Sequence, residues 1–150
     1  MCSSDLRYWL SRKQWNSYQN PSFLEADSIF PDNIQPIYDA GLLNLIENDF
    51  ILTEGFKLSL FDGHSEGQIV TFIDTKNGIC VFPGDLIPTS AHVPLEWISA
   101  YDISAIDSVN EKSRFLQGAE QNDYTLIYCH DAYTETSKVK KLNDSYKASK

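Results

Sequence analysis

The chain has 150 residues, which suits one domain with a buried core, and its 42% hydrophobic and 22% charged residues are typical of a globular protein. The formal net charge of −9 argues against a nucleic-acid partner, because phosphate binding needs a basic surface. No run reaches the roughly 18 consecutive apolar residues of a membrane span, so we expect no membrane partner. The opening residues do not read as a secretory signal, and the cytoplasm is the default location.

The cysteines suggest no covalent framework. Cys2, Cys80 and Cys129 are an odd number without the close spacing of a disulfide scaffold or zinc finger. Cys80 and Cys129 lie inside apolar runs, which favours buried and unreactive thiols.

The first part of the chain, residues 7 to about 40, is expected to be helical. Helical patterning runs through "RYWLSRKQWNSYQ", breaks at Asn20, and resumes in "SFLEADSIF" and "DNIQPIYDAG". Pro31 and Pro36 predict a broken helix in the last of these segments. Gly41 is a suitable residue to end it.

From Leu43 onward the pattern changes to that of strands. Alternating or β-branched runs occur in "LNLIE", "FKLSLF", "QIVTFID" and "GICVF". The Asn77-Gly78 pair between the last two runs predicts a hairpin. A helix is then predicted to start with a capping box formed by Ser108 and Glu111. The short apolar run "YTLIYCH" is typical of a buried strand.

The lysine-rich tail has two interpretations. It forms an edge hairpin around Asn143-Asp144, or it is a frayed end.

Strand directions bring three polar residues to one edge of the predicted sheet. Two hairpin reversals and one helical crossover give the same direction to three strands, at residues 56–61, 78–82 and 124–129. His64, Asp85 and His130 follow the ends of these strands. Imidazole nitrogen and carboxylate oxygen are zinc ligands, and a carboxylate between two imidazoles suits a two-metal site.

Each of these residues also has an ordinary interpretation. His64 fits a turn histidine, Asp85 after a glycine fits a turn residue, and His130 beside Asp131 fits a strand end. Composition and spacing leave both interpretations open.

Three segments together resemble the second half of a metallo-β-lactamase-fold metallohydrolase: "FDGHSEGQ", "VFPGDLIPTSAHVPLEWISAYD" and "TLIYCHD". The family has a Gly-His-(Ser/Thr)-x-Gly turn, a strand that ends in Gly-Asp, and a final strand that ends in His or His-Asp. His64, Asp85 and His130 match these motifs in order. The resemblance implies an α/β (α+β) protein with a partial αββα sandwich, mainly the C-terminal sheet and its helices.

The match lacks the family's HxHxDH signature, which supplies four ligands from the first half of the fold. We therefore expect residues 1–150 to be a single, truncated domain, the C-terminal part of a dinuclear zinc hydrolase and inactive as this fragment. The resemblance implies two zinc ions in the complete enzyme, with iron or manganese as alternatives. The sheet face without its partner is expected to expose apolar surface around Leu58, Leu60 and Ile69, so the isolated chain should self-associate.

The segment after Asp85 is expected to border the site. His92, Trp97 and Tyr101 are candidates for the wall of an apolar substrate pocket, although Trp97 and Tyr101 could instead pack the loop onto the sheet. Asp131 is a candidate acceptor that orients His130 or His64, or else an exposed turn carboxylate.

The family implies hydrolysis of a small molecule, in which a metal-bound hydroxide attacks an ester, lactone, thioester or amide-type bond. No catalytic residue beyond the metal ligands is assigned. Some lactonases of the family have a tyrosine three positions after the bridging aspartate, where this chain has Pro88. The alternatives are a non-catalytic binding or scaffold module that has lost the metal site, and an iron-dependent oxidoreductase, whose usual flavodoxin-like extension has no counterpart here.

Overall fold

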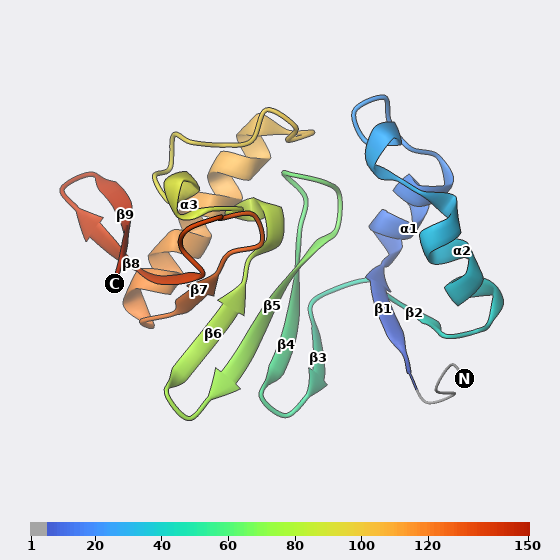
Figure 1. Ribbon diagram of the computed structural model, residues 1–150, viewed down its shortest axis with the longest axis horizontal. Helices are drawn as coiled ribbons and strands as arrows, with labels where there is room; N and C mark the ends of the chain where they lie inside the picture. Colours follow the sequence, from blue (N-terminus) through green and yellow to red (C-terminus); the bar gives the residue numbers. More distant parts are fainter. Residues whose placement is uncertain (1–5) are drawn as a thin grey trace.

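The computed structural model describes residues 6–150. Its N-terminal part pairs two short parallel strands, β1 (Tyr8–Ser11) and β2 (Leu43–Ile46), around a helical connection. That connection contains α1 (Arg12–Gln19), the 3-10 turn η1 (Ala26–Ser28) and α2 (Pro31–Asp39). Figure 1 shows this part beside the main sheet.

The main sheet has seven strands in the order β3-β4-β5-β6-β7-β8-β9. Their bounds are β3 (Phe50–Thr53), β4 (Phe56–Phe61), β5 (Gln68–Thr75), β6 (Gly78–Phe82), β7 (Thr125–Ile127), β8 (Thr136–Leu142) and β9 (Ser145–Ser149). All neighbouring strands are antiparallel except β6 and β7, which are parallel. The connection between these two holds the short turns η2 (Gly84–Leu86) and η3 (Ser90–His92) and the helix α3 (Ala105–Gln121).

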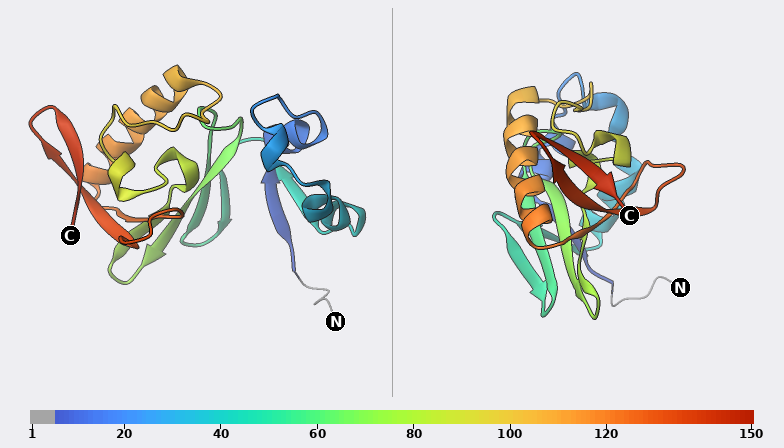
Figure 2. Two further views of the ribbon diagram at one scale, coloured as in Figure 1. Left: turned by 45° about the horizontal axis from the view of Figure 1, so that its top comes forward. Right: turned by 90° about the vertical axis from the view of Figure 1, so that its left-hand side faces the viewer.

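The core lies between the sheet and α3, which covers one face (Figure 2). The sheet contributes Val70, Val81 and Leu126, all fully buried. From the helix, Phe115 and Leu116 pack against them. The expected mixed α/β fold is therefore confirmed, and this core fixes the strand ends that carry the polar residues.

The opposite face of the sheet is less well covered. Side chains alternate along a strand, so Leu58 and Leu60 point away from the face on which Phe61 packs against α3. Leu58 is buried, but Leu60 and Ile69 are partly exposed and Phe82 is 39% exposed. Apolar surface is therefore accessible on this face, as the sequence suggested for two of its three named residues.

The predicted helix from residue 7 is wrong at its start, because Tyr8–Ser11 forms a strand instead. Tyr8–Ser11 is a strand because its backbone pairs in parallel with residues 43–46, and α1 begins only where the Ser11 hydroxyl accepts the Gln14 N–H. The segment 21–30 contains only η1 rather than a longer helix. The predicted break at the prolines is also wrong: α2 starts at Pro31, the first helical position, which tolerates proline, and continues through Pro36 to Asp39. Gly41 follows the helix end with φ +67°.

The start of α3 also differs from the prediction. Ser104, not Ser108, caps the helix: its hydroxyl accepts the Asp107 N–H and donates to the Asp107 carboxylate. Ser108 lies one turn inside the helix and is buried. A serine facing the core cannot cap, which moves the helix start four residues upstream.

The hairpin predictions are confirmed. β5 and β6 are joined by two residues, with Gly78 at φ +111° after the turn. The tail forms the β8–β9 hairpin, with Asn143 in the left-handed region at its tip. Within residues 6–150, none of the helices combines the length and apolarity needed to cross a membrane.

Candidate metal centre

The three strands β4, β6 and β7 run in the same direction and bring His64, Asp85 and His130 together. The Asp85 carboxylate lies between the two imidazoles. Its Oδ2 is 3.3 Å from His64 Nε2, and its Oδ1 is 3.1 Å from His130 Nε2. Residues that are 21 and 45 positions apart in the sequence thus meet around one carboxylate.

The turn that carries His64 is fastened to α3. The Glu111 carboxylate accepts hydrogen bonds from the N–H groups of Asp62 and Gly63, at 2.9–3.1 Å. The Asp62 carboxylate closes the turn by accepting the Gly67 N–H at 2.8 Å. A Cβ atom on Gly63 would lie 2.3 Å from the Ser108 nitrogen, so only glycine allows this approach to the helix.

A buried carboxylate orients the imidazole of His64. Asp102 Oδ1 lies 2.9 Å from His64 Nδ1, and the Asp102 side chain is only 5% exposed. This leaves Nε2 directed at Asp85. The hydrogen bond with Asp102, followed by the one with Asp85, raises the pKa of His64 to about 9. No motif in the sequence around Asp102 indicates this role.

Lys112 holds the segment that leads to Asp102. Its ammonium group donates to the carbonyl oxygens of Pro94 and Trp97, both at 2.7 Å, and the residue is 1% exposed. Burial lowers the pKa of Lys112 to about 8. Successive residues of α3, Glu111 and Lys112, therefore fasten the two segments that flank His64.

Asp85 owes its position to the residue before it. Gly84 has φ +56°, a conformation that favours glycine, and it turns the chain out of β6. The hydrogen bond from His64 is the largest influence on the Asp85 carboxyl and helps to hold its pKa below the ordinary value. Asp85 is therefore a carboxylate at neutral pH, as a metal ligand must be.

His130 is held more loosely. Its backbone N–H donates to the Pro88 carbonyl at 3.0 Å, but its side chain is 65% exposed. The preceding residue, Cys129, places its Sγ 3.5 Å from Asp85 Oδ1. Burial, followed by the charge of Asp85, raises the pKa of the Cys129 thiol to about 11.

The donors fit a divalent cation. Imidazole nitrogens and a carboxylate are zinc ligands, and two carboxylates, Asp85 and Asp102, converge on His64. The Asp85, Cys129 and His130 ligand atoms lie within 4.8 Å of one another. Neutral imidazoles can coordinate, and a cation beside Asp85 would replace the proton that the two carboxylates stabilise on His64.

A pocket of about 560 Å³ opens over these residues. His92 and Tyr101 line it together with His64, Asp85 and His130. Trp97 does not line it: this side chain is 63% exposed and its backbone oxygen is bound by Lys112. Tyr101 is 74% exposed, and it lines the pocket.

Asp131 is used differently from the expectation that it orients an imidazole. Its carboxylate accepts hydrogen bonds from the N–H and hydroxyl of Ser90 and from the N–H groups of Tyr133 and Thr134. These bonds hold its pKa far below the ordinary value. Asp131 therefore ties the segment after His130 to η3.

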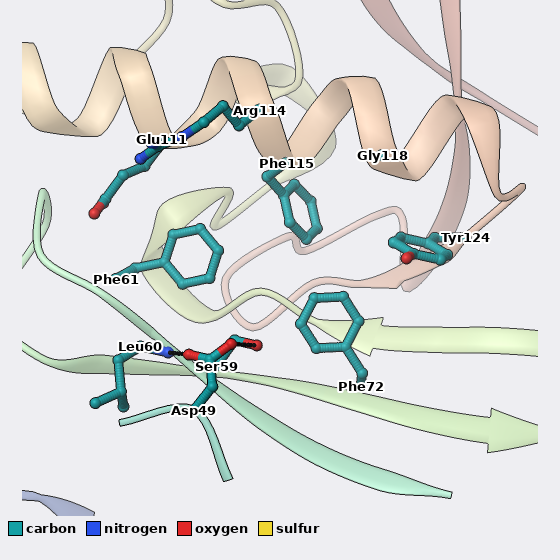
Figure 3. A pocket seen from close by; sticks show the side chains of 10 residues that line it. All are labelled: Asp49, Ser59, Leu60, Phe61, Phe72, Glu111, Arg114, Phe115, Gly118 and Tyr124. Carbon is teal, nitrogen blue, oxygen red and sulfur yellow. Dashed lines mark hydrogen bonds between the residues drawn. The ribbon is translucent and has the colours of Figure 1, made fainter. Parts of the chain in front are cut away.

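A second cavity, of about 330 Å³, lies on the α3 side of the sheet. Figure 3 shows Phe61, Phe72 and Phe115 around it, with Glu111 and Arg114 above them. Glu111 connects this cavity to the His64 turn, because its side chain borders the cavity and its carboxylate binds the turn.

Comparison with known proteins identifies the fold. No family model and no curated protein matches the chain. A probable metal-dependent hydrolase from Staphylococcus aureus is 26% identical with a TM-score of 0.80, over 87% of this chain and 46% of that one. AidC, a dizinc quorum-quenching lactonase, is 19% identical with a TM-score of 0.76, over 94% and 53%. The hydrolase AbOPH of the beta lactamase superfamily is 17% identical with a TM-score of 0.79, over 95% and 54%.

These structures confirm the fold that the resemblance implies. The chain has their fold, and it spans about half the length of the solved structures that it matches. One of these neighbours is described as a probable metal-dependent hydrolase and another as a dizinc lactonase.

Proposed function

We propose that this chain is the C-terminal part of a dinuclear metallohydrolase that cleaves a small molecule. His64, Asp85 and His130 would hold the metal ions, with Asp85 as a ligand shared between them. The observation that supports this proposal best is the placement of one imidazole nitrogen on each oxygen of the same carboxylate, at 3.3 and 3.1 Å.

The residues of this chain would hold and orient the metal pair. When bound, such ions supply a nucleophile from water near neutral pH and polarise the oxygen of the bond to be cleaved. Asp102 fixes the His64 ring so that Nε2 faces the metal side, which is how carboxylate–histidine pairs tune metal ligands. The pocket in front of Asp85 would receive the substrate.

The bond cleaved is proposed to be an ester, lactone, thioester or amide-type bond. AidC, a structural neighbour, is a lactonase, which supports this range. Pro88 lines the pocket three positions after Asp85, where some lactonases of the family carry tyrosine. The chain itself therefore argues against a simple lactonase.

The rest of the ligand set would come from a first half of the fold that carries HxHxDH. On this view the partly exposed sheet face around Leu60, Ile69 and Phe82 packs against that half. The chain expressed alone should then self-associate through this face, and sedimentation velocity would detect it. A monodisperse monomer that melts cooperatively would contradict this expectation.

The test begins with the coding DNA upstream of Met1. An in-frame HxHxDH supports the proposal, whereas a genuine promoter and start codon favour a binding or scaffold module. The longer protein should contain two metals per chain by elemental analysis and should hydrolyse at least one member of an ester, lactone and thioester panel. His64→Ala should empty mostly one site, while His92→Ala, which alters a pocket residue not bonded to Asp85, should leave both filled. Two occupied sites in His64→Ala would show that the ligand assignment is wrong.

A further inference from the structure

We propose that Cys129 is a third metal ligand, so that Asp85, Cys129 and His130 form a complete three-ligand site within this chain. This inference rests on the proposed function for the role of Asp85 and His130 and adds a thiolate to them. The family motifs matched in the sequence include no cysteine at this position. The occupant would be one borderline or soft divalent ion, such as Zn²⁺, Co²⁺ or Cd²⁺.

The positions of the three donor atoms support this site. Asp85 Oδ1 is 3.1 Å from His130 Nε2 and 3.5 Å from Cys129 Sγ, and all three atoms lie within 4.8 Å of one another. Metal–ligand bonds of about 2.0–2.3 Å place tetrahedral ligand atoms roughly 3.3–3.8 Å apart. The two distances to Asp85 Oδ1 are therefore close to those of a tetrahedral site, and the exposed His130 side chain is free to adjust.

The chain path explains how two successive residues reach one point. β7 ends at Ile127, so side chains after it no longer alternate between the faces of the sheet. The His130 N–H bond to the Pro88 carbonyl, and the contact of the thiol with the same carbonyl, fold residues 129–130 over the segment after Asp85. Both side chains therefore face the carboxylate.

The two oxygens of Asp85 divide the donors between two positions. His64 contacts Oδ2, whereas Cys129 and His130 contact Oδ1. By motif matching alone, each metal position receives only two ligands from this chain. Cys129 raises the number on the Oδ1 side to three, the usual protein contribution at a catalytic zinc. The Oδ1 position should therefore bind metal without help from any other segment.

Metal binding at this position would convert the thiol to a thiolate. The sulfur forms a bond to the ion, the S–H bond breaks, and the proton leaves to water. No oxidant or reductant is involved. The other cysteine placed by the structure, Cys80, lies on β6 and belongs to no such cluster in residues 6–150.

The experiment is a titration of the metal-free 150-residue protein with Co²⁺, followed by absorption spectroscopy. The starting protein is the C2S/C80S variant, which keeps Cys129 as its sole thiol. We expect one equivalent of Co²⁺, a thiolate-to-cobalt charge-transfer band in the near ultraviolet, and the visible bands of a four-coordinate ion. Adding Cys129→Ser should abolish the charge-transfer band.

The same substitution should also weaken Co²⁺ binding. Loss of a residue that merely supports a ligand typically costs about 10–100-fold in metal affinity, and loss of a ligand should cost at least as much. His64→Ala should keep the band, because His64 is on the other oxygen of Asp85. Circular dichroism checks that each variant is folded.

Three outcomes would overturn the inference: no charge-transfer band when Co²⁺ binds, a band that survives Cys129→Ser, or no Co²⁺ binding by the folded chain. The first two remove only the thiolate ligand. In each of the three cases, two metals bound through Asp85 and both imidazoles in the longer protein would leave the proposed function standing. Conversely, a Cys129-dependent band in a protein that lacks hydrolytic activity in its longer form would support this site and reject the proposed function.

Discussion

The two sides of Asp85 differ in how firmly the protein holds them. On one side, the His64 side chain is 22% exposed and is oriented by the buried Asp102. On the other side, the His130 side chain is 65% exposed, and its Nε2 lies 3.1 Å from Asp85 Oδ1. The His64 side is therefore preorganised and the His130 side is adjustable.

The difference originates in α3. Glu111 binds the turn that carries His64, and Lys112 binds the segment that leads to Asp102. No residue of α3 contacts His130 by a hydrogen bond in the described chain. A ligand fastened to a packed helix keeps its geometry without a metal, whereas an exposed ligand is free to adjust to one.

The largest effect is expected from Gly63→Ala, which tests the fastening of the His64 turn directly. The new Cβ would lie 2.3 Å from the Ser108 nitrogen, so the turn must separate from α3. We expect the free energy of unfolding to fall by about 3 kcal/mol or more, measured by urea denaturation.

The matched control is Gly118→Ala, a substitution within α3, the helix that the Gly63 turn contacts. A Cβ there meets no atom within 4 Å, and replacing a helical glycine should raise stability by about 0.5–1 kcal/mol. Equal effects of the two substitutions would show that the turn is not pressed against α3.

The second largest effect is a dependence of the free energy of unfolding on pH, and it is caused by Lys112. Its pKa is about 8 in the folded protein, against an ordinary 10.5, because burial disfavours the ammonium form despite Glu96 and Asp102 nearby. Between these values the unfolded chain binds more protons, so stability should rise with pH from 8 toward 10.5. Relative to Lys112→Met, the wild type should gain about 2–3 kcal/mol across this window. Parallel pH profiles of unfolding for the two proteins would contradict the assignment.

The sequence was sufficient for the directions of β4, β5, β6 and β7 and for the meeting of His64, Asp85 and His130. Hairpin turns and a helical crossover determine strand direction, and strand direction places the strand ends. It was insufficient where a distant pairing decides the outcome. Tyr8–Ser11 has a helical pattern, but pairing with residues 43–46 makes it a strand.

The side chains around the site were harder to foresee. Asp102 bonds to the ring of His64, 38 residues away in the sequence. Glu111 accepts the backbone N–H of Gly63, 48 residues away. Nothing in their local sequence marks them, because such contacts depend on how α3 is docked. Cys129 looked like a core thiol within an apolar run, and only the end of β7 after Ile127 turns it toward Asp85.

A smaller effect is expected from Glu111→Gln. The amide keeps one acceptor oxygen but loses the charge that strengthens the bonds to the Asp62 and Gly63 N–H groups. Stability should fall by about 1–2 kcal/mol, measured by urea denaturation. Glu120→Gln, an exposed position on the same helix, should leave it unchanged within error. If the two variants behave alike, Glu111 does not anchor the turn.

The smallest effect on stability is expected from His130→Ala, which tests the adjustable side. The ring is mostly exposed and lies 3.1 Å from Asp85 Oδ1, so the free energy of unfolding should change by no more than about 0.5 kcal/mol. His64→Ala should cost clearly more, because it leaves the buried Asp102 carboxylate without its partner. Measuring both variants in the absence and presence of Zn²⁺ separates structure from ligation: added metal should stabilise the wild type and give His130→Ala little benefit. A loss of stability on His130→Ala as large as that of His64→Ala, in metal-free protein, would mean that both sides of Asp85 are equally preorganised.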